Sequence, residues 1–462
     1  MKFKTLRNSI IACLLFTFAG ATQIFAQADA LVDTLQKKGL LTQREANEVR
    51  EQMFKDAREQ FPGMKIKVGS WLDEMKLYGD MRLRYEQFWD RQGGTAGNGG
   101  LLGTFEQQDR TRYRFRLRAG MVATAGDWEA GFRLASGDGS GATSDSISTN
   151  TTFDGFGSKK NINIDLAYLK YMASFIKHGE LSLMGGKMEN PFWETDMVYD
   201  PDLTPEGFAE QYKFKVNDAY SLFANLSQWA LAEENTTGIG SPSTVGQDRY
   251  MMGYQVGHEW KIAPKKIELK QAVGYYDYVN LRGQASATDT GSLPVLNNAN
   301  AVRNGTVVFE DEFNVLAINN ELKLGYWEKY PIRLQGEYIN NLGQTFSGLD
   351  AYLNEGYKVG AILGEAKKKG QWQIGYWYER LEANATFSGF SDSDFGGGGT
   401  NNKGHIVKAA YMLTDWASLG LAYFNVQPIT DIVNSGTTAS TLQLNQRGNS
   451  TQRFQFDVIM KF

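Results

Sequence analysis

Apolar and polar side chains alternate with a period of two from about residue 75 to the end of the chain. In the stretch RTRYRFRLRAGM, for example, Tyr113, Phe115 and Leu117 alternate with arginines, and the C-terminal stretch RFQFDVIMKF alternates in the same way. This period gives an extended segment one apolar and one polar face. The pattern predicts β-strands, and it is compatible with a soluble sandwich as well as with a membrane barrel.

The segments between the strands distinguish these two architectures. We expect sixteen strands, near residues 75–88, 109–125, 127–137, 161–174, 179–188, 209–216, 218–230, 248–262, 265–280, 310–325, 330–341, 354–367, 370–384, 403–414, 416–428 and 448–462. The gaps alternate between short turns, such as Gly126 and Asp415, and long polar segments, such as 138–160 and 281–309. Tight turns at one end and long loops at the other are typical of bacterial transmembrane barrels. The sequence therefore predicts an all-β fold, a 16-stranded antiparallel transmembrane β-barrel over residues 75–462.

Tryptophans support the barrel because they cluster near the proposed short turns. The five that lie within a few residues of such a turn are Trp128, Trp260, Trp327, Trp372 and Trp416. Amphipathic rings favour the membrane–water interface, so we expect an aromatic girdle at the short-turn end. Tryptophans scattered through a core are the alternative.

The N-terminus has the composition of an export signal. Basic residues up to Arg7 precede a short apolar run, and the small residues of Ala26-Gln27-Ala28 follow it. This order predicts a signal peptide over residues 1–28. The apolar run is too short to cross a bilayer as a helix.

Residues 29–63 have a helical period instead of a strand period. Gly39 would end a first short helix, and Thr42 with Glu45 forms a capping box for a second. We expect a helical hairpin here. An even number of strands places both chain ends on the short-turn side, so the hairpin would be periplasmic. Its apolar positions predict contact with a partner through residues 29–61, and a spacer without a partner is the alternative.

Composition excludes several other classes of protein. The formal net charge of −4 argues against a nucleic-acid partner. The chain has three histidines and one cysteine, Cys13, which lies in the signal segment. Ser391-Asp392-Ser393-Asp394 lacks the ligand spacing of a calcium loop, and a Gly-rich extracellular loop is the better interpretation. We therefore expect no catalytic site, no cofactor and no metal.

Several stretches resemble a known family, the putative porins of Gram-negative outer membranes. The stretches are LQKKGLLTQREANEVRE (35–51), KLYGDMRLRYE (76–86), the R-x-R-x-R strand and GGKMENPFWETDMVYDPDLTPEG (185–207). The family is distantly similar to phosphate-selective and general 16-stranded porins, and the resemblance covers essentially the whole chain after the signal segment. It implies passive transport across the outer membrane and leaves the solute open.

The clearest candidate site is a basic wall inside the barrel. Its residues, which share the polar faces of the first two strands, are Arg82, Arg84, Arg112, Arg114, Arg116 and Arg118. Facing lipid, each charge would cost about 2–4 kcal/mol near the bilayer midplane, so these side chains must line the lumen. Such a wall would attract anions. The alternative is neutralisation by inward acids such as Asp80, Glu86 and Glu129.

The third long loop, about 189–208, differs from the others because it is rich in aromatics and acids. Its acids are Glu194, Asp196, Asp200, Asp202 and Glu206. In porins resembling this chain the third loop folds into the lumen and narrows it. Acids there would face the basic wall and create a transverse field. An ordinary solvated surface loop is the alternative.

These observations favour a porin of the bacterial outer membrane, a passive diffusion channel for small hydrophilic solutes or ions with an anion preference. The expected surroundings are the lipid bilayer and the transported solutes. Similar porins are commonly homotrimers, although no interface is readable in this sequence. The rival interpretation is a non-conducting barrel that serves as an adhesin or an envelope-structural protein.

Overall fold

The computed structural model describes residues 72–89, 92–93, 106–107, 109–139, 145–173, 179–232, 248–281, 312–343, 353–429 and 451–462. The expected signal peptide and helical hairpin lie outside these residues. The chain divides into two compact units, Met1–Met64 and Lys65–Phe462. All the described residues belong to the second unit.

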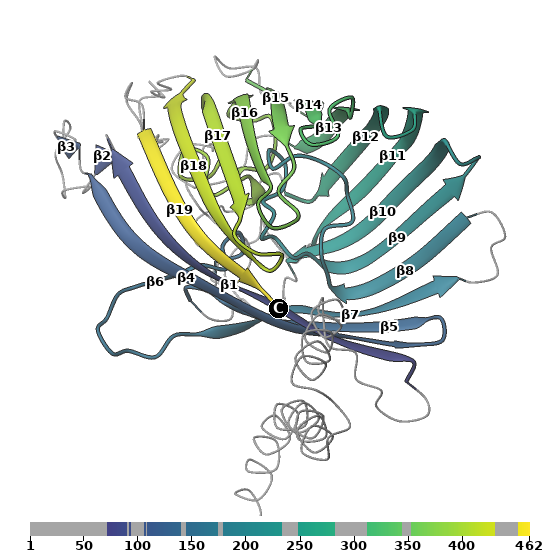
Figure 1. Ribbon diagram of the computed structural model, residues 1–462, viewed down its shortest axis with the longest axis horizontal. Helices are drawn as coiled ribbons and strands as arrows, with labels where there is room; N and C mark the ends of the chain where they lie inside the picture. Colours follow the sequence, from purple (N-terminus) through teal and green to yellow (C-terminus); the bar gives the residue numbers. More distant parts are fainter. Residues whose placement is uncertain are drawn as a thin grey trace, which may run out of the picture. The chain divides into compact units, whose positions relative to one another are not determined.

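Sixteen antiparallel strands form the wall of a closed barrel (Figure 1). They are β1 (Glu74–Trp89), β4 (Arg110–Ala125), β5 (Trp128–Ser136), β7 (Ile162–Ala173), β8 (Gly179–Lys187), β9 (Glu206–Lys215), β10 (Tyr220–Ala232), β11 (Arg249–Ala263), β12 (Ile267–Val279), β13 (Phe313–Leu324), β14 (Ile332–Asn341), β15 (Glu355–Gly364), β16 (Trp372–Leu381), β17 (Asn402–Met412), β18 (Ala417–Pro428) and β19 (Thr451–Lys461). The expected all-β barrel is confirmed, with the strands close to their expected positions.

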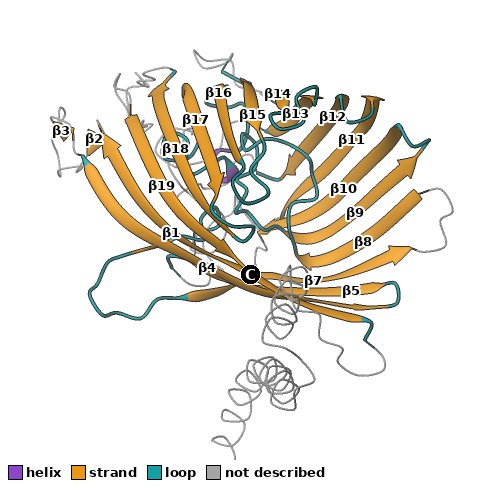
Figure 2. Cartoon of the chain, in the orientation of Figure 1, coloured by secondary structure: helices purple, strands orange, loops and turns teal. Residues whose placement is uncertain are grey.

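Minor elements accompany the wall. β2 (Gln92–Gly93) pairs with β3 (Glu106–Gln107), and β6 (Thr151–Thr152) pairs with Arg114 and Phe115 of β4, next to the part of β4 that pairs with β5. A single 3₁₀ turn, η2 (Ser388–Phe390), is the helical element among the described residues (Figure 2). Within those residues no helix has the length and apolar character needed to cross a membrane.

Closure of the barrel reaches the last residue. β19 pairs with β1, and beyond the end of β19 the backbone N–H of Gly79 donates to the carbonyl oxygen of Phe462 at 2.8 Å while Phe462 N–H donates back at 3.0 Å. A Cβ at position 79 would overlap the Phe462 ring, so a glycine is required for this close approach. Pairing of the first and last strands leaves the sheet without an open edge.

The period of two sorts the side chains between the two faces of the wall. On β1 the outward Met81 and Leu83 are 42% and 46% exposed, whereas the inward Arg84 and Glu86 are buried. The same outward apolar exposure recurs on the other strands. A continuous exposed apolar surface is unfavourable in water and favourable in lipid. The outer surface is therefore suited to a bilayer.

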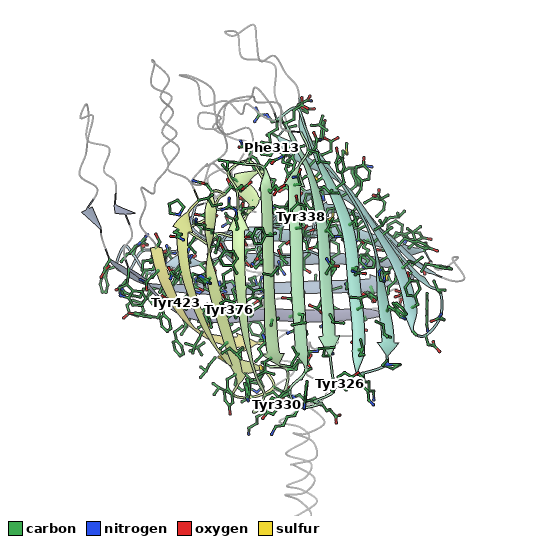
Figure 3. The ribbon with its side chains drawn as sticks, turned by 90° about the horizontal axis from the view of Figure 1, so that it is seen from above. Phe313, Tyr326, Tyr330, Tyr338, Tyr376 and Tyr423 are labelled. Carbon is green, nitrogen blue, oxygen red and sulfur yellow. The ribbon has the colours of Figure 1, made fainter. Side chains whose placement is uncertain are left out.

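Aromatic residues gather at the short-turn end of the wall. Trp128, Trp260, Trp327, Trp372 and Trp416 are all exposed. Tyr326 and Tyr330, in the short connection between β13 and β14, lie at the same end of the barrel (Figure 3). Their positions agree with the expected aromatic girdle, and not with tryptophans scattered through a core.

The interior is packed at the long-loop end. Its apolar core combines Tyr199 and Met197 from the connection between β8 and β9 with Phe387 and Phe390 from the connection between β16 and β17. These side chains pack against inward residues of β10 to β14 and β16, including Trp229. Figure 2 shows the corresponding loops inside the arc of strands. The loops thus fill part of the lumen.

Candidate functional site

The predicted basic wall is formed by β1 and β4, which are neighbours in the barrel. Their register places Arg82 opposite Arg116 and Arg84 opposite Arg114. Like charges directly opposite each other are unfavourable unless other groups compensate them. Arg84, Arg114 and Arg116 are nevertheless buried, so compensating groups must lie close by.

Acids on the same strands and on β19 provide that compensation. Asp80 accepts hydrogen bonds from Nε of Arg116 at 2.9 Å and from Nε of Arg118 at 2.7 Å. Asp457 accepts two hydrogen bonds from Arg84, at 2.7 and 2.8 Å. Glu86 forms ion pairs with Arg112 and with Arg453. Much of the arginine wall is therefore neutralised locally. Glu129, the third acid considered from the sequence, instead accepts a hydrogen bond from the Tyr168 hydroxyl at 2.9 Å.

Arg82 differs from the other arginines of the wall. Its Nη2 donates to the side-chain oxygen of Asn150 at 2.5 Å. No carboxylate of the described part of the chain lies within ion-pair distance of Arg82. The side chain is partly exposed. Arg82 therefore contributes positive charge that the wall does not cancel by direct pairing.

Residues 188–205, here called loop 3, connect β8 to β9 and enter the interior of the barrel. Trp193 is fixed to β11 because its N–H donates to Gln255 at 2.9 Å and its carbonyl accepts from Gln255 at 2.8 Å. Glu194 accepts a hydrogen bond from the Tyr276 hydroxyl of β12 at 2.6 Å. Thr195 hydrogen-bonds to Glu337 of β14. Three consecutive residues thus attach loop 3 to three strands.

Two further acids of loop 3 form ion pairs with basic side chains on different parts of the wall. Asp196 forms ion pairs with Lys358 of β15 and, at 3.5 Å, with Lys408 of β17. Asp202 lies 3.4 Å from Arg116 and 3.7 Å from Arg118 of β4. Loop 3 therefore connects β15 and β17 to the arginine wall across the lumen.

The remaining two predicted acids have different surroundings. Asp200 is buried, its N–H donates to the carbonyl of Phe390 at 2.6 Å, and its carboxylate accepts from the Ser393 N–H at 2.8 Å. Glu206 belongs to β9, where its 67% exposed side chain pairs with Lys187 at 3.1 Å. β9 begins three residues earlier than expected, so Glu206 does not join the other four acids.

Burial separates the loop carboxyls into two groups by pKa. Burial raises the pKa of Glu194 to about 8, although hydrogen bonds from Tyr276 and Asn190 oppose the shift. Burial also raises the pKa of Asp200, with nearby Asp392 and Asp202 adding to the effect. For Asp202, burial acts in the same direction, but the arginines beside it outweigh burial and lower its pKa. Near neutral pH, Glu194 thus carries little charge.

Two other long connections also enter the interior, and the sequence did not indicate this. The connection between β16 and β17, residues 382–401, is here called loop 7. Asp394 of loop 7 lies 3.3 Å from Arg84 and 2.7 Å from Arg453. Residues 145–150, between β5 and β7, bring Thr149 to Asp202 at 3.0 Å and Asn150 to Arg82. Asp392 and Asp394, interpreted from the sequence as parts of an extracellular loop, therefore lie against loop 3 and the arginine wall.

Sequence reasoning also missed the cations outside β1 and β4. Lys358, Lys408 and Arg133 lie on the inner face, and Arg133 pairs with Asp165 and with Glu189 at 2.7 Å. The alternation of inward and outward residues could have identified these three side chains, since a charged residue at an inward position of a barrel strand lines the lumen. In each case the residues two positions away on the same face are uncharged, so no ladder like that of β4 is visible in the sequence.

A cavity of about 550 Å³ lies beside loop 3 in the lumen. Its lining includes Arg118 and Arg133 on one side of the barrel, and Lys358, Trp377 and Lys408 on another. A second cavity of about 430 Å³ is lined by β1, β4, β5, β7, β8, β9 and the start of loop 3. Both are bordered by polar groups that can solvate a hydrophilic solute. Among the described residues no group of three or more His, Cys, Asp or Glu side chains could hold a metal ion.

A closed antiparallel barrel with an apolar outer surface, an aromatic end and an ionised inner wall is a transmembrane barrel of the outer-membrane type. The chain belongs to the porin family described as "Putative porin", whose family pattern matches residues 102–306 and 294–462. It is accordingly an outer-membrane porin.

Solved structures of two outer-membrane proteins are similar to the chain at low sequence identity. A high-pH structure of OprB from Pseudomonas putida has 11% identity and a TM-score of 0.46, covering 83% of this chain and 94% of that one. The outer-membrane channel DcaP of Acinetobacter baumannii has 12% identity and a TM-score of 0.43, covering 87% and 99%. No curated protein sequence matches the chain.

Proposed function

We propose that this porin is a passive diffusion channel for small hydrophilic solutes with a weak preference for anions. The observation that carries the preference is the unequal neutralisation of charges around loop 3. Arg82 has no carboxylate partner among the described residues, and the Lys408 side chain is 42% exposed. The loop acids offset these cations only in part. Asp196 is shared between Lys358 and Lys408, Asp202 is bound to Arg116 and Arg118, and the other two acids have raised pKa values.

The charge at the narrowest point decides which ion passes, since salt screens charges beyond about 10 Å at 0.1 M. Replacing Arg82 by Gln should therefore move the reversal potential in a KCl gradient toward lower anion preference. Lys215→Gln is the matched control, because Lys215 is the last residue of β9 at the short-turn end, where it is 66% exposed and paired with Asp218. An equal reversal potential in wild type and Arg82→Gln would contradict the proposal.

Loop 3 is proposed to set the width of the channel. In support, it is attached to β11, β12 and β14 through consecutive residues and to β4 through Asp202. A segment fixed at both sides of the lumen must exclude solutes from the space that it occupies. This is the role expected from the sequence for the constriction acids.

A non-conducting barrel remains the second candidate function, and one observation favours it. Residues of loops 3 and 7 pack into a continuous apolar core at the long-loop end. If this packing closes the lumen completely, the long loops would serve as a display surface instead. Bilayer recordings separate the candidates, because the channel requires stepwise currents and the adhesin or structural barrel requires none.

We also propose that the porin associates with other proteins or with further copies of itself. Phe153 and Phe156, in the connection between β6 and β7, are exposed, and Phe153 lies against Phe115 with ring centroids 6.0 Å apart. Exposed aromatics beside the β4 edge would suit a homotrimer contact. Residues 29–61, expected to form a periplasmic helical hairpin after a signal peptide over residues 1–28, are the second proposed contact. Crosslinking followed by mass determination tests both.

A further inference from the structure

Trp377 has an unusual support on the inner wall of the barrel. It lies on β16, with Gly375 two residues before it on the same face and Gly360 of β15 directly opposite it. A Cβ at either glycine would overlap the indole. The indole therefore lies flat across two glycines, against the backbone of the wall.

The orientation of the indole is fixed as well as its position. Its Nε1–H donates to the side-chain oxygen of Gln335 at 3.0 Å. Glycine inside a strand weakens the strand and often marks a site of close approach. The indole that rests on these two glycines thus forms a flat aromatic platform. Trp377 also lines the cavity of about 550 Å³ beside loop 3.

A cation lies next to this platform. Lys408 of β17 is opposite Gly375, two residues along the ladder from Trp377 and on the same face, and it lines the same cavity. Asp196 is 3.5 Å from Lys408 but is held more closely by Lys358. An ammonium group has three donors, and the Lys408 side chain is 42% exposed. Donors of Lys408 are therefore available to a molecule in the cavity.

We propose that Trp377 and Lys408 form a binding site for small ring compounds that carry one carboxylate. The ring stacks on the part of the indole that borders the cavity, and the carboxylate accepts hydrogen bonds from Nζ of Lys408. This inference rests on the proposed channel function, since solutes must reach the cavity through the lumen. It adds a class of solute to that function.

Block of single-channel current by benzoate tests the site. Benzoate is added to channels in symmetric KCl, and the concentration that halves the current is measured. Trp377→Leu and Lys408→Gln should each raise this concentration about five-fold, since each removes one favourable contact. Gly375→Ala should have a similar effect, because its Cβ displaces the indole without changing any charge.

The matched controls change the same types of residue on the same two strands, but at positions that face outward. Trp372→Leu removes an outward tryptophan of β16, and Lys403→Gln removes an outward lysine of β17. Both should block like wild type. Acetate, which lacks the ring, and benzyl alcohol, which lacks the charge, should block about five-fold less well than benzoate. Glucuronate shows whether a sugar ring serves as well as an aromatic one.

The outcomes separate this inference from the proposed function. Normal open-channel conductance with equal benzoate block in wild type and Trp377→Leu would overturn the site and leave the channel intact. Absence of current in wild type would contradict the channel. Calorimetric titration of the folded, detergent-solubilised protein with benzoate would then decide the site, and equal heats from wild type, Trp377→Leu and Lys408→Gln would overturn it.

Discussion

The pKa of Glu194 makes a quantitative prediction about loop 3. Two states of loop 3 are compared: the closed loop, packed in the lumen as in the structure, and a released loop exposed to water. In the closed loop, burial raises the pKa of Glu194 to about 8 from an ordinary value of 4.5. In a loop released into water, the carboxyl would titrate near its ordinary value. Between pH 4.5 and pH 8 the released loop therefore carries one proton less than the closed loop. Linkage requires that rising pH in this window favours release.

The size of the effect follows from this difference in bound protons. Each pH unit within the window disfavours the closed loop by about 1.4 kcal/mol. From pH 5 to pH 7 the shift is about 3 kcal/mol, or a factor of about one hundred in the ratio of released to closed loops. The contribution of Glu194 to loop closure is fully present below pH 4.5, falls up to pH 8 and is constant above pH 8.

Other carboxyls act in the same window or outside it. Burial and the neighbouring Asp196 raise the pKa of Asp392 to about 7, so Asp392 adds a change of the same sign. Asp200 acts in the same direction. The pKa of Asp202 is lowered, so its contribution to closure is present above its ordinary value of 3.8 and is lost only on further acidification.

Single-channel dwell times provide the assay. The logarithm of the ratio of high-conductance to low-conductance dwell times is plotted against pH from 5 to 8. Glu194→Gln should reduce the slope of this plot by about one, because it removes one titrating group. Glu189→Gln is the control, since Glu189 begins the same loop but its side chain is 69% exposed. An identical slope in Glu194→Gln and wild type would show that Glu194 does not control release of loop 3.

Three further predictions concern conduction and assembly. Replacing residues 194–202 by a short Gly-Ser linker should raise single-channel conductance and admit larger sugars, whereas unchanged conductance would place the constriction elsewhere. Asp202→Asn removes an acid beside Arg116 and Arg118, so the reversal potential should move toward stronger anion preference. Glu206→Gln is the control, because the exposed Glu206 side chain should leave the reversal potential unchanged. A shift of the opposite sign in Asp202→Asn would count against the proposed selectivity. Removing residues 29–61 while retaining residues 1–28 should leave conductance unchanged and lower the oligomeric mass, and an equal mass would reduce the segment to a spacer.

The barrel was predictable because lipid and water impose opposite demands on alternate residues of each strand. Outward Leu83 and inward Arg84 differ in the solvent that they meet, so their alternation specifies both the strand and its faces. The alternation of loop lengths then determined the number and antiparallel order of the strands. The arginine wall followed from the same rule.

The contents of the lumen were harder to predict. Loop 7 is rich in Gly, Ser and Asp, a composition without periodicity that also describes a solvated surface loop. Its inward course depends on Phe387 and Phe390 packing against residues such as Tyr199, which are distant in sequence. The partners of the arginines also depend on register, because Asp80 meets Arg116 and Arg118 only once β1 and β4 are aligned. Both features arise from tertiary contacts.

The most direct test of the central claim is a planar-bilayer recording of the purified full-length porin in symmetric KCl. We expect long-lived stepwise currents, because polar cavities beside loop 3 lie within a lumen of ionised side chains. Heat-dependent migration in detergent gels would verify in the same sample that the barrel is folded. A folded barrel that gives no current at any voltage would contradict the proposed channel function and favour a lumen closed by loops 3 and 7.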